Sequence, residues 1–241
     1  MSLFQGRFIQ RIVILTGAGV SAESGLNTFR DSGGLWENHD PMEIATPEAF
    51  ERDPGLVYRF YNARWEQLAD VAPNPAHEAI ARLQDQFRGQ VFLVTQNVDD
   101  LHERGGSQQV CHMHGELASM WCRACDGRFT VTAAYNASSV CPGCGTDGKL
   151  RPDIVWFGEI PYDMERIAME LSACELFIAI GTSGTVYPAA GFVQQATRSG
   201  ATAVEVNKAV SDVTGFFHDQ RQGPATIEVP ALVDELLSSQ A

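Results

Sequence analysis

The chain has 241 residues, which suits one large domain or one domain with a small insertion. Its 30 acidic residues outnumber the 17 basic ones and give a formal net charge of −13. This balance argues against a nucleic-acid-binding protein, because basic side chains that neutralise phosphates supply much of such affinity. The sequence shows no signal-peptide pattern and no apolar run long enough to span a bilayer, so we expect a soluble, cytoplasmic protein with no membrane partner.

The first clear pattern is a strand followed by a turn of small residues. Residues 11–16 are mostly branched and apolar, as in a strand that is buried on both faces. Residues 17–22 then fit the G-x-G-x-x-G/A turn, in which small residues let backbone N–H groups reach a pyrophosphate. Many glycine-rich turns bind nothing, but the position of this one directly after a buried strand favours a nucleotide site.

A loop and three helices are predicted next. Residues 23–36 are rich in glycine and polar residues, which is typical of a loop beside a nucleotide; its aromatic residues either cover the ligand or anchor the loop. Helices are expected over residues 47–52, 54–69 and 75–87. The second helix carries Tyr61 and Arg64 three residues apart, on one face. Such a pair can clamp a carboxylate, although more often it belongs to a solvated face.

A polar cluster follows the next predicted strand, residues 90–95. It contains Asn97 and Asp99, and ligands bind at this edge of an open parallel sheet. His112 and His114 come soon after and share one face if their segment is extended. An imidazole beside a nucleotide site is a candidate general base, although most histidines are surface or core residues.

Two C-x-x-C pairs point to zinc. Cys122 and Cys125 are separated from Cys141 and Cys144 by 15 residues, the spacing of a closed, structural four-thiolate site. A redox role is the lesser interpretation. The spacing therefore predicts a small module braced by one structural zinc ion.

The rest of the chain alternates between strands and helices. Residues 150–158 return to a strand pattern, which Pro152 places at a sheet edge or in a connector, where an extended peptide can pair with it. The remaining predicted elements are strands over 176–180, 203–207 and 227–229 and helices over 163–173, 188–199 and from Pro230 onward. This alternation predicts an α/β fold with a doubly wound parallel sheet of Rossmann type.

In their order along the chain, these motifs resemble the sirtuin family. The resemblance covers nearly the whole chain and is carried by residues 17–25, 28–31, 95–99, 114–115 and 181–183 together with the two cysteine pairs. Residues 60–64 are similar to those of class III, the bacterial and desuccinylase-like branch. The resemblance implies an NAD-dependent protein-lysine deacylase, a deacetylase and also a desuccinylase or demalonylase, with one structural zinc ion. The fold that it implies is a Rossmann-type NAD-binding domain made of residues 1–115 and 151–241, with a small zinc-ribbon domain over residues 116–150 inserted into it. Its expected partners are acyl-lysine proteins or peptides, and its expected products include nicotinamide and O-acyl-ADP-ribose.

The resemblance also implies roles for individual residues. His114 is the expected catalytic base. The expected cofactor contacts are Gly17, Ala18, Gly19, Ser21, Glu23, Thr28, Phe29, Arg30, Trp36, Gln96, Asn97, Val98, Asp99, Gly181, Thr182, Ser183, Asn207, Lys208, Ala209 and Ala225. The expected substrate contacts are Tyr61 and Arg64 for an acidic acyl group, and Val155, Trp156, Phe157, Gly158 and Glu159 as the strand that holds the peptide. Trp65 departs from the pattern, since close bacterial relatives carry a second arginine at this position.

Three other functions fit parts of the same pattern. A mono-ADP-ribosyltransferase shares the NAD chemistry but modifies a protein. A Rossmann oxidoreductase keeps its nicotinamide and forms NADH. A zinc-ribbon interaction protein binds a partner without turnover, so acyl-peptide-dependent consumption of NAD excludes it.

Overall fold

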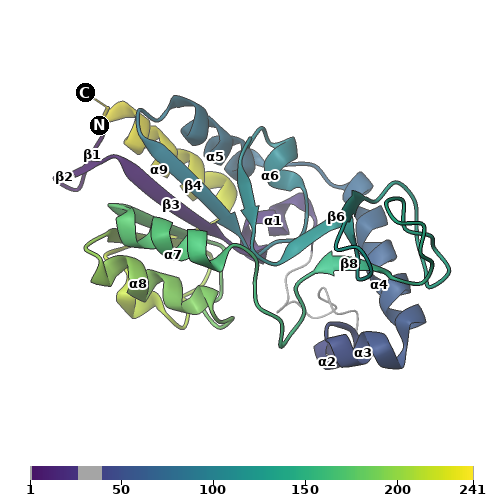
Figure 1. Ribbon diagram of the computed structural model, residues 1–241. Helices are drawn as coiled ribbons and strands as arrows, with labels where there is room; N and C mark the ends of the chain where they lie inside the picture. Colours follow the sequence, from purple (N-terminus) through teal and green to yellow (C-terminus); the bar gives the residue numbers. More distant parts are fainter. Residues whose placement is uncertain (1, 27–39, 241) are drawn as a thin grey trace.

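A six-stranded parallel sheet forms the centre of the larger part of the molecule (Figure 1). The computed structural model describes residues 2–26 and 40–240, and the strands of this sheet are β3 (Arg11–Thr16), β4 (Gln90–Thr95), β5 (Val110–His112), β9 (Leu176–Ile180), β10 (Thr202–Asn207) and β11 (Asp219–Gln222). Counted along the chain, they lie in the order 3-2-1-4-5-6, with β3 beside β9. The predicted doubly wound Rossmann-type sheet is therefore confirmed. Because the strand order reverses between β3 and β9, a ligand crevice is expected where these two strands end.

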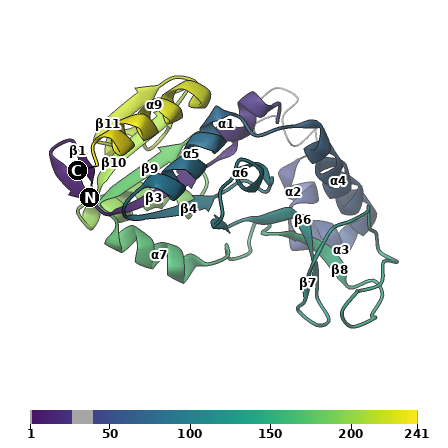
Figure 2. The ribbon, with the colours of Figure 1, turned by 90° about the horizontal axis from the view of Figure 1, so that it is seen from above.

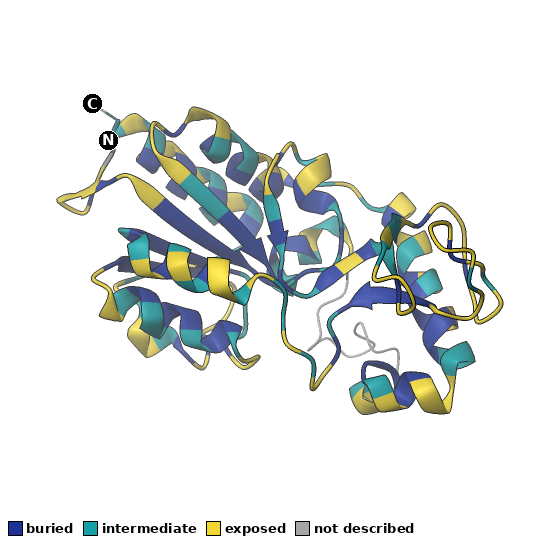
Figure 3. Cartoon of the chain, viewed as in Figure 1, coloured by how far each residue is buried: buried dark blue, intermediate teal, exposed yellow. Residues whose placement is uncertain are grey.

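Helices cover both faces of this sheet (Figure 1). They are α5 (Pro75–Gln86) and α9 (Ala225–Ser238) on one face, and α7 (Met164–Ala173) and α8 (Phe192–Arg198) on the other. Ile12 and Ile14 of β3 lie in the first core, whereas Val13 and Leu15 lie in the second. Figure 3 colours most of β3 as buried, and the two cores show that both of its faces are covered. Burial on both faces explains why the sequence of β3 is an almost unbroken apolar run.

The smaller part of the molecule is a three-stranded antiparallel sheet packed against helices. Its strands, in spatial order, are β7 (Arg128–Thr130), β6 (Gly115–Cys122) and β8 (Leu150–Ile154). Seen from above, β6 leads from the larger part into the smaller one (Figure 2). A third hydrophobic cluster joins this sheet to α4 (Pro54–Gln67), and the Tyr58 hydroxyl donates to the Leu150 carbonyl at 2.5 Å. The edge position of β8 agrees with the prediction from Pro152. The division into domains at residues 116 and 150 stays a prediction.

The other elements are short. They are β1 (Ser2–Phe4), β2 (Arg7–Ile9), α1 (Ala18–Ser21), α2 (Pro41–Ile44), α3 (Pro47–Arg52), α6 (Leu101–Arg104) and the 3-10 turns Ala22–Ser24, Leu68–Asp70, Ala189–Gly191 and Thr214–Phe216. Among the helices that the structure describes, α4 and α9 are the longest at 14 residues each, and none combines the length and apolarity needed to cross a membrane.

The end of the chain differs from the prediction. The predicted strand over residues 227–229 is wrong, because these residues and Pro230 lie inside the single helix α9. Residues of α9 at helical spacing, Ala225, Val229, Leu232, Val233 and Leu236, are buried in the core that also contains α5. This packing outweighs the main-chain hydrogen bond that Pro230 cannot make.

The last strand is instead β11, which the sequence analysis missed. Its residues, Asp219–Gln222, are all polar and alternate between half-buried and exposed. Because β11 pairs with β10 alone, at the edge of the sheet, it needs no apolar run and carries no strand signal.

Candidate active site

Two turns of small residues meet at the centre of the sheet, where β3 and β9 end. The Gly17 N–H donates to the Ile180 carbonyl at 3.0 Å, and the Gly19 N–H donates to the Gly181 carbonyl at 2.8 Å. A Cβ atom on Gly19 would lie 2.6 Å from Gly181 Cα, and one on Gly17 would lie 2.9 Å from the Gly181 oxygen. These glycines are therefore required by the contact between the two turns. The sequence predicted that small residues here leave N–H groups free to reach a pyrophosphate. The N–H groups of Gly17 and Gly19 are not free, because both donate to carbonyls of the protein.

A buried polar cluster lies beside this contact. The Ser21 hydroxyl donates to Asp99 Oδ2 at 3.0 Å and accepts from the Asn97 side-chain amide at 3.0 Å. Burial raises the pKa of Asp99, while the Leu101 N–H and the Ser21 hydroxyl act in the opposite direction. The cluster presents a hydroxyl, an amide and a carboxylate from two segments, α1 after β3 and the loop after β4, at the same edge of the sheet.

Further predicted cofactor residues are tied to one another around this cluster. The Gln96 amide donates to the Thr182 hydroxyl at 3.0 Å, and the Asn207 amide donates to the Thr182 carbonyl at 2.8 Å. Glu23 pairs with Lys208 at 3.3 Å and accepts from the Thr226 N–H, next to Ala225.

The structure thus gathers most of the predicted cofactor contacts at the C-terminal ends of β3, β4, β9 and β10. Of the remaining ones, Ala18 belongs to α1, Val98 accepts from the Leu117 N–H, Ser183 bonds Thr185, and Ala209 is exposed after β10. Thr28, Phe29, Arg30 and Trp36 lie outside the described residues.

Two histidines that the sequence analysis gave no catalytic role lie beneath the cluster. His77 and His102 are fully buried, with ring centroids 4.9 Å apart. The Asn74 N–H donates to His77 Nδ1 at 3.2 Å, so the neutral ring carries its proton on Nε2, which faces Ser21 Oγ at 3.4 Å. His102 Nε2 lies 2.9 Å from the Thr16 hydroxyl. No sequence pattern predicts this pairing, because His77 and Ser21 are brought together only by the fold.

Acid is expected to destabilise the fold through these two rings. Burial lowers the pKa of His77 to about 4 and lowers that of His102 well below its ordinary value of 6.5. The unfolded chain takes up both protons near pH 6.5, so stability is lost as the pH falls from there toward 4, by about 3 kcal/mol for His77 alone. Urea unfolding at about pH 7.5, 6 and 5 measures the effect. The control His218→Gln, at an exposed ring, should show the same loss of stability between pH 7.5 and 5. Equal free energies of unfolding of the unmodified protein at all three pH values would contradict the prediction.

His112 and His114 flank the point where the chain leaves the larger sheet for the smaller one. Met113 and His114 form a turn between β5 and β6, so the segment is not one continuous strand. Both rings nevertheless face the same loop: His114 Nδ1 lies 3.1 Å from the Gln96 carbonyl, and His112 Nδ1 lies 3.3 Å from the Asn97 carbonyl.

The ring of His114 is set up as a base. A carbonyl only accepts, so Nδ1 carries the proton and the neutral ring leaves a lone pair on Nε2. Burial lowers the pKa of His114, and the bond to Gln96 offsets this in part. The ring is therefore neutral at pH 7. His112 differs, because its Nε2 faces Glu103 Oε1 at 2.8 Å.

Gly115 lies where another strand of the protein passes close to its backbone. Its φ is +82°, and a Cβ atom there would lie 1.9 Å from the Asp153 carbonyl oxygen. The close approach is made by strand β8 of the same chain, not by a ligand.

The predicted peptide segment is a turn, not a strand. Strand β8 ends at Ile154, and Trp156 is 2% exposed. Glu159 accepts from the Trp156 N–H at 2.8 Å and from Arg151 at 2.7 Å, which folds the segment back on itself. Gly158 follows with a φ of +90°. The strand ends earlier than predicted because the Glu159 carboxylate accepts the Trp156 N–H, which a neighbouring strand would otherwise pair with.

This turn joins the predicted acyl-binding residues to His114. The Val155 N–H donates to the His114 carbonyl at 2.9 Å, and the Trp156 indole donates to the Tyr61 hydroxyl at 3.0 Å. Phe157 donates through its N–H to the Ala45 carbonyl and is 49% exposed. Arg64 is 6% exposed, with its guanidinium 4.5 Å from the centre of the Phe60 ring.

The four predicted zinc ligands come together in the smaller part. Their sulfur atoms all lie within 4.8 Å of one another, and the Cys122–Cys144 and Cys125–Cys141 pairs are each 3.8 Å apart. A tetrahedral ion with Zn–S bonds of about 2.3 Å places its sulfurs about 3.8 Å apart. The cluster therefore fits one structural zinc ion held by Cys122, Cys125, Cys141 and Cys144.

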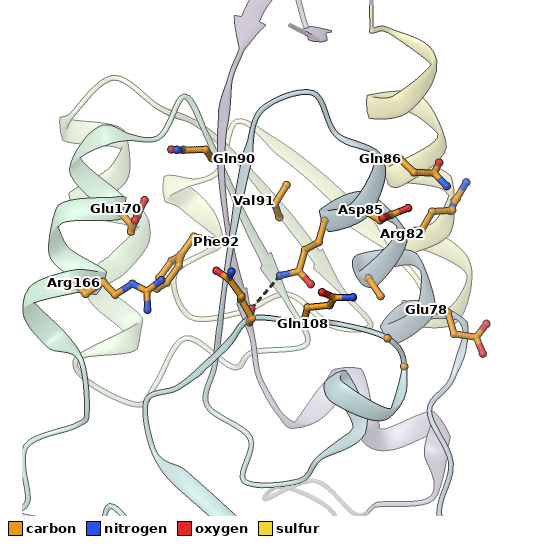
Figure 4. A pocket seen from close by; sticks show the side chains of 15 residues that line it. Glu78, Arg82, Asp85, Gln86, Gln90, Val91, Phe92, Gln108, Arg166 and Glu170 are labelled. Atoms are coloured by element: carbon orange, nitrogen blue, oxygen red, sulfur yellow. Dashed lines mark hydrogen bonds between the residues drawn. The ribbon is translucent and has the colours of Figure 1, made fainter.

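A polar cavity of about 800 Å³ opens at the N-terminal end of β4, away from the polar cluster at the C-terminal end of this strand (Figure 4). Gln90 and Phe92 line it from β4, Asp85 from α5 and Arg166 from α7. It includes none of the predicted site residues that the structure describes.

Comparisons with known proteins agree with this geometry. Residues 17–188 match the model of the Sir2 family. An NAD-dependent protein deacylase of Shewanella oneidensis is 52% identical over 233 residues, which cover 96% of this chain and 96% of that relative.

Two solved structures share the fold. A Sir2 homologue in complex with NAD is 38% identical, with a TM-score of 0.87, over 95% of this chain and 90% of that one. A complex of Sir2, a p53 peptide and NAD+ is 27% identical, with a TM-score of 0.79, over 94% and 93% of the two chains.

Proposed function

Because this chain belongs to the Sir2 family and is an NAD-dependent protein deacylase, we propose that it removes acetyl, succinyl and malonyl groups from lysine side chains. In this proposal the acyl group is transferred to ADP-ribose, so acyl-lysine, NAD and one water molecule yield nicotinamide, O-acyl-ADP-ribose and the free lysine. Bound NAD supplies an ADP-ribosyl group on a cationic leaving group.

The position of His114 carries the proposal. Its ring is held by the Gln96 carbonyl, next to the polar cluster, and its own carbonyl accepts from Val155, at the start of the proposed peptide segment. One residue thus links the proposed cofactor and substrate sites. We assign it the role of general base, which accepts a proton at Nε2 from a sugar hydroxyl.

The proposed cofactor site matches the chemistry of a dinucleotide. Ser21, Asn97 and Asp99 offer donors and acceptors suited to ribose hydroxyls and a carboxamide, and Asn207 and Gln96 extend this polar surface across the ends of β10 and β4. Holding two reactants in a fixed geometry lowers the barrier by proximity, which matters here because an amide oxygen is a weak nucleophile.

Tyr61 and Arg64 support acceptance of an acidic acyl group. The Tyr61 oxygen accepts from the Trp156 indole, and a hydroxyl that accepts can also donate its own O–H to a carboxylate. A carboxylate that meets this hydroxyl and a guanidinium gains charge-assisted hydrogen bonds, which are strong in a buried setting. Tyr61 and Arg64 are 7% and 6% exposed.

A panel of acyl-lysine peptides tests the proposal. Acetyl, propionyl, succinyl, malonyl and longer acyl peptides are assayed with NAD for nicotinamide release. We expect turnover of the acetyl, succinyl and malonyl peptides, and inactivity toward all acidic acyl peptides would overturn the proposed preference.

Arg64→Met is expected to lower the kcat/KM for a succinyl peptide by about tenfold or more, while kcat/KM for an acetyl peptide changes by less than about threefold. Methionine keeps an apolar chain against Phe60 but removes the charge. The matched control is Arg59→Met, at an exposed arginine of the same helix, which should leave both values unchanged. Unchanged succinyl-peptide turnover in the Arg64 variant would count against the clamp.

A further inference from the structure

His112 is a second histidine with a defined charge state beside the proposed cofactor site. Its Nδ1 faces the Asn97 carbonyl at 3.3 Å and its Nε2 faces Glu103 Oε1 at 2.8 Å. Both partners only accept, so both ring nitrogens must carry a proton to satisfy them. The arrangement selects the imidazolium form, in contrast to His114, which has one acceptor at Nδ1.

The charges around His112 favour the same form. Burial by itself lowers the pKa of His112, but the hydrogen bond and charge of Glu103, with the charge of Glu116, raise it above its ordinary value. The ring is 7% exposed and Glu103 is 42% exposed, so the cation lies inside and its partner lies at the rim. The pair therefore places a positive charge under the surface at this point.

This charge acts on the polar cluster. It lowers the pKa of Asp99, against the effect of burial, and it also lowers the pKa of His102. The titratable groups that face His112 are Glu103 and His102 from α6, Glu116 from β6 and Asp99 from the loop after β4. Of these, Asp99 accepts the hydrogen bond of Ser21.

We propose that His112, paired with Glu103, is a positioning residue for NAD binding: it fixes the Asn97 carbonyl and places a positive charge beside the Asp99 carboxylate. The inference rests on the proposed cofactor site. His112 touches the loop rather than the reacting atoms, so it acts through Asn97 and Asp99. The residue sets the shape and charge of the loop, whereas His114 takes the proton.

NAD binding is expected to depend on the protonation of His112. As the pH rises through the pKa of His112, the ring loses one proton and can then donate to only one of its two acceptors, Glu103 or the Asn97 carbonyl. The positive charge beside Asp99 is lost at the same time, so NAD binding weakens on the alkaline side. Removing the charge of Glu103 lowers the pKa of His112 and moves this loss to lower pH.

The test measures the dissociation constant of NAD by calorimetry between about pH 6 and 9.5, alongside kcat for an acetyl peptide. Glu103→Gln keeps a hydrogen-bond acceptor without the charge, and its alkaline loss of affinity should begin at a lower pH. His112→Asn keeps a donor for the Asn97 carbonyl and removes the titration, so its affinity should be about tenfold weaker near neutral pH and flat above it. In both variants kcat at saturating NAD should change by less than about threefold.

The control is Glu165→Gln, at an exposed carboxylate of α7, which should reproduce the unmodified profile. A Glu103→Gln profile that coincides with the unmodified one would overturn the proposal, as would a folded His112→Asn protein with unchanged affinity. Because NAD affinity is read without turnover, these outcomes differ from a failure of the proposed function. In that case the unmodified protein would bind NAD and leave every acyl peptide intact.

Discussion

His114→Ala is expected to lower acyl-lysine turnover by at least about a hundredfold while the affinity for NAD and the zinc content remain those of the unmodified protein. The reason is the tautomer: the Gln96 carbonyl holds the proton on Nδ1, and this makes Nε2 the basic atom. His114→Asn retains a donor for that carbonyl but has no basic nitrogen, so it should be as inactive as the alanine variant. Recovery of turnover in the asparagine variant would show that the ring serves only to hold the loop.

The pH dependence of turnover tests the role of His114 as a base independently. Burial lowers the pKa of His114, so the neutral, active form persists below the ordinary value of 6.5. Turnover limited by this base should therefore decline at a lower pH than the ordinary histidine pKa of 6.5 would give. The control His218→Ala, at an exposed ring on the far edge of the sheet, should keep turnover within about twofold. A His114→Ala protein with more than about a tenth of the original turnover would contradict the assignment.

Cys141→Ala is expected to remove the zinc ion and unfold the smaller sheet. Structural zinc contributes about 10–16 kcal/mol in small zinc modules, which is comparable to the whole stability of a typical domain. Cys122 and Cys141 are also 0% and 1% exposed members of the third hydrophobic cluster, so loss of the ion disturbs the packing of β6 and β8 against α4. The two cores of the larger sheet are separate from this cluster and should persist.

Metal analysis and amide hydrogen exchange measure this effect. We expect about one zinc ion per chain in the unmodified protein and almost none in the variant, with fast exchange in β6 and β8 and unchanged protection in β3 and β9. Cys174→Ala is the matched control, since Cys174 is a buried cysteine of another core and should leave the zinc content unchanged. A zinc-free Cys141 variant with native protection in β6 would contradict the structural role.

The central strands were predictable because burial on both faces leaves a continuous apolar run between breakers. The bounds of β3, β4 and β9 match those read from the sequence. The edge strand β11 was not predictable, since its residues Asp219–Gln222 face solvent and carry no apolar run. Pro230 was misread as a helix start, although the apolar spacing from Ala225 to Leu236 already indicates one helix through it.

The residues of the candidate site also fall into a predictable group and an unpredictable one. Residues that lie in local motifs, such as the four cysteines, were predictable because their spacing specifies the geometry. Contacts that cross the fold were not. Ser21 meets His77, and Tyr61 meets Trp156, only because separate elements pack together. The close contacts at Gly17, Gly19 and Gly115 were also not predictable, since each glycine accommodates the backbone of a distant part of the chain.

Acyl transfer to ADP-ribose is tested most directly by the stoichiometry of products from one acyl-lysine peptide and NAD. Each lysine freed should be accompanied by one nicotinamide and one O-acyl-ADP-ribose, with no NADH and no ADP-ribose attached to protein. Nicotinamide release without the peptide, with ADP-ribose bound to protein, would contradict acyl transfer and support ADP-ribosylation instead.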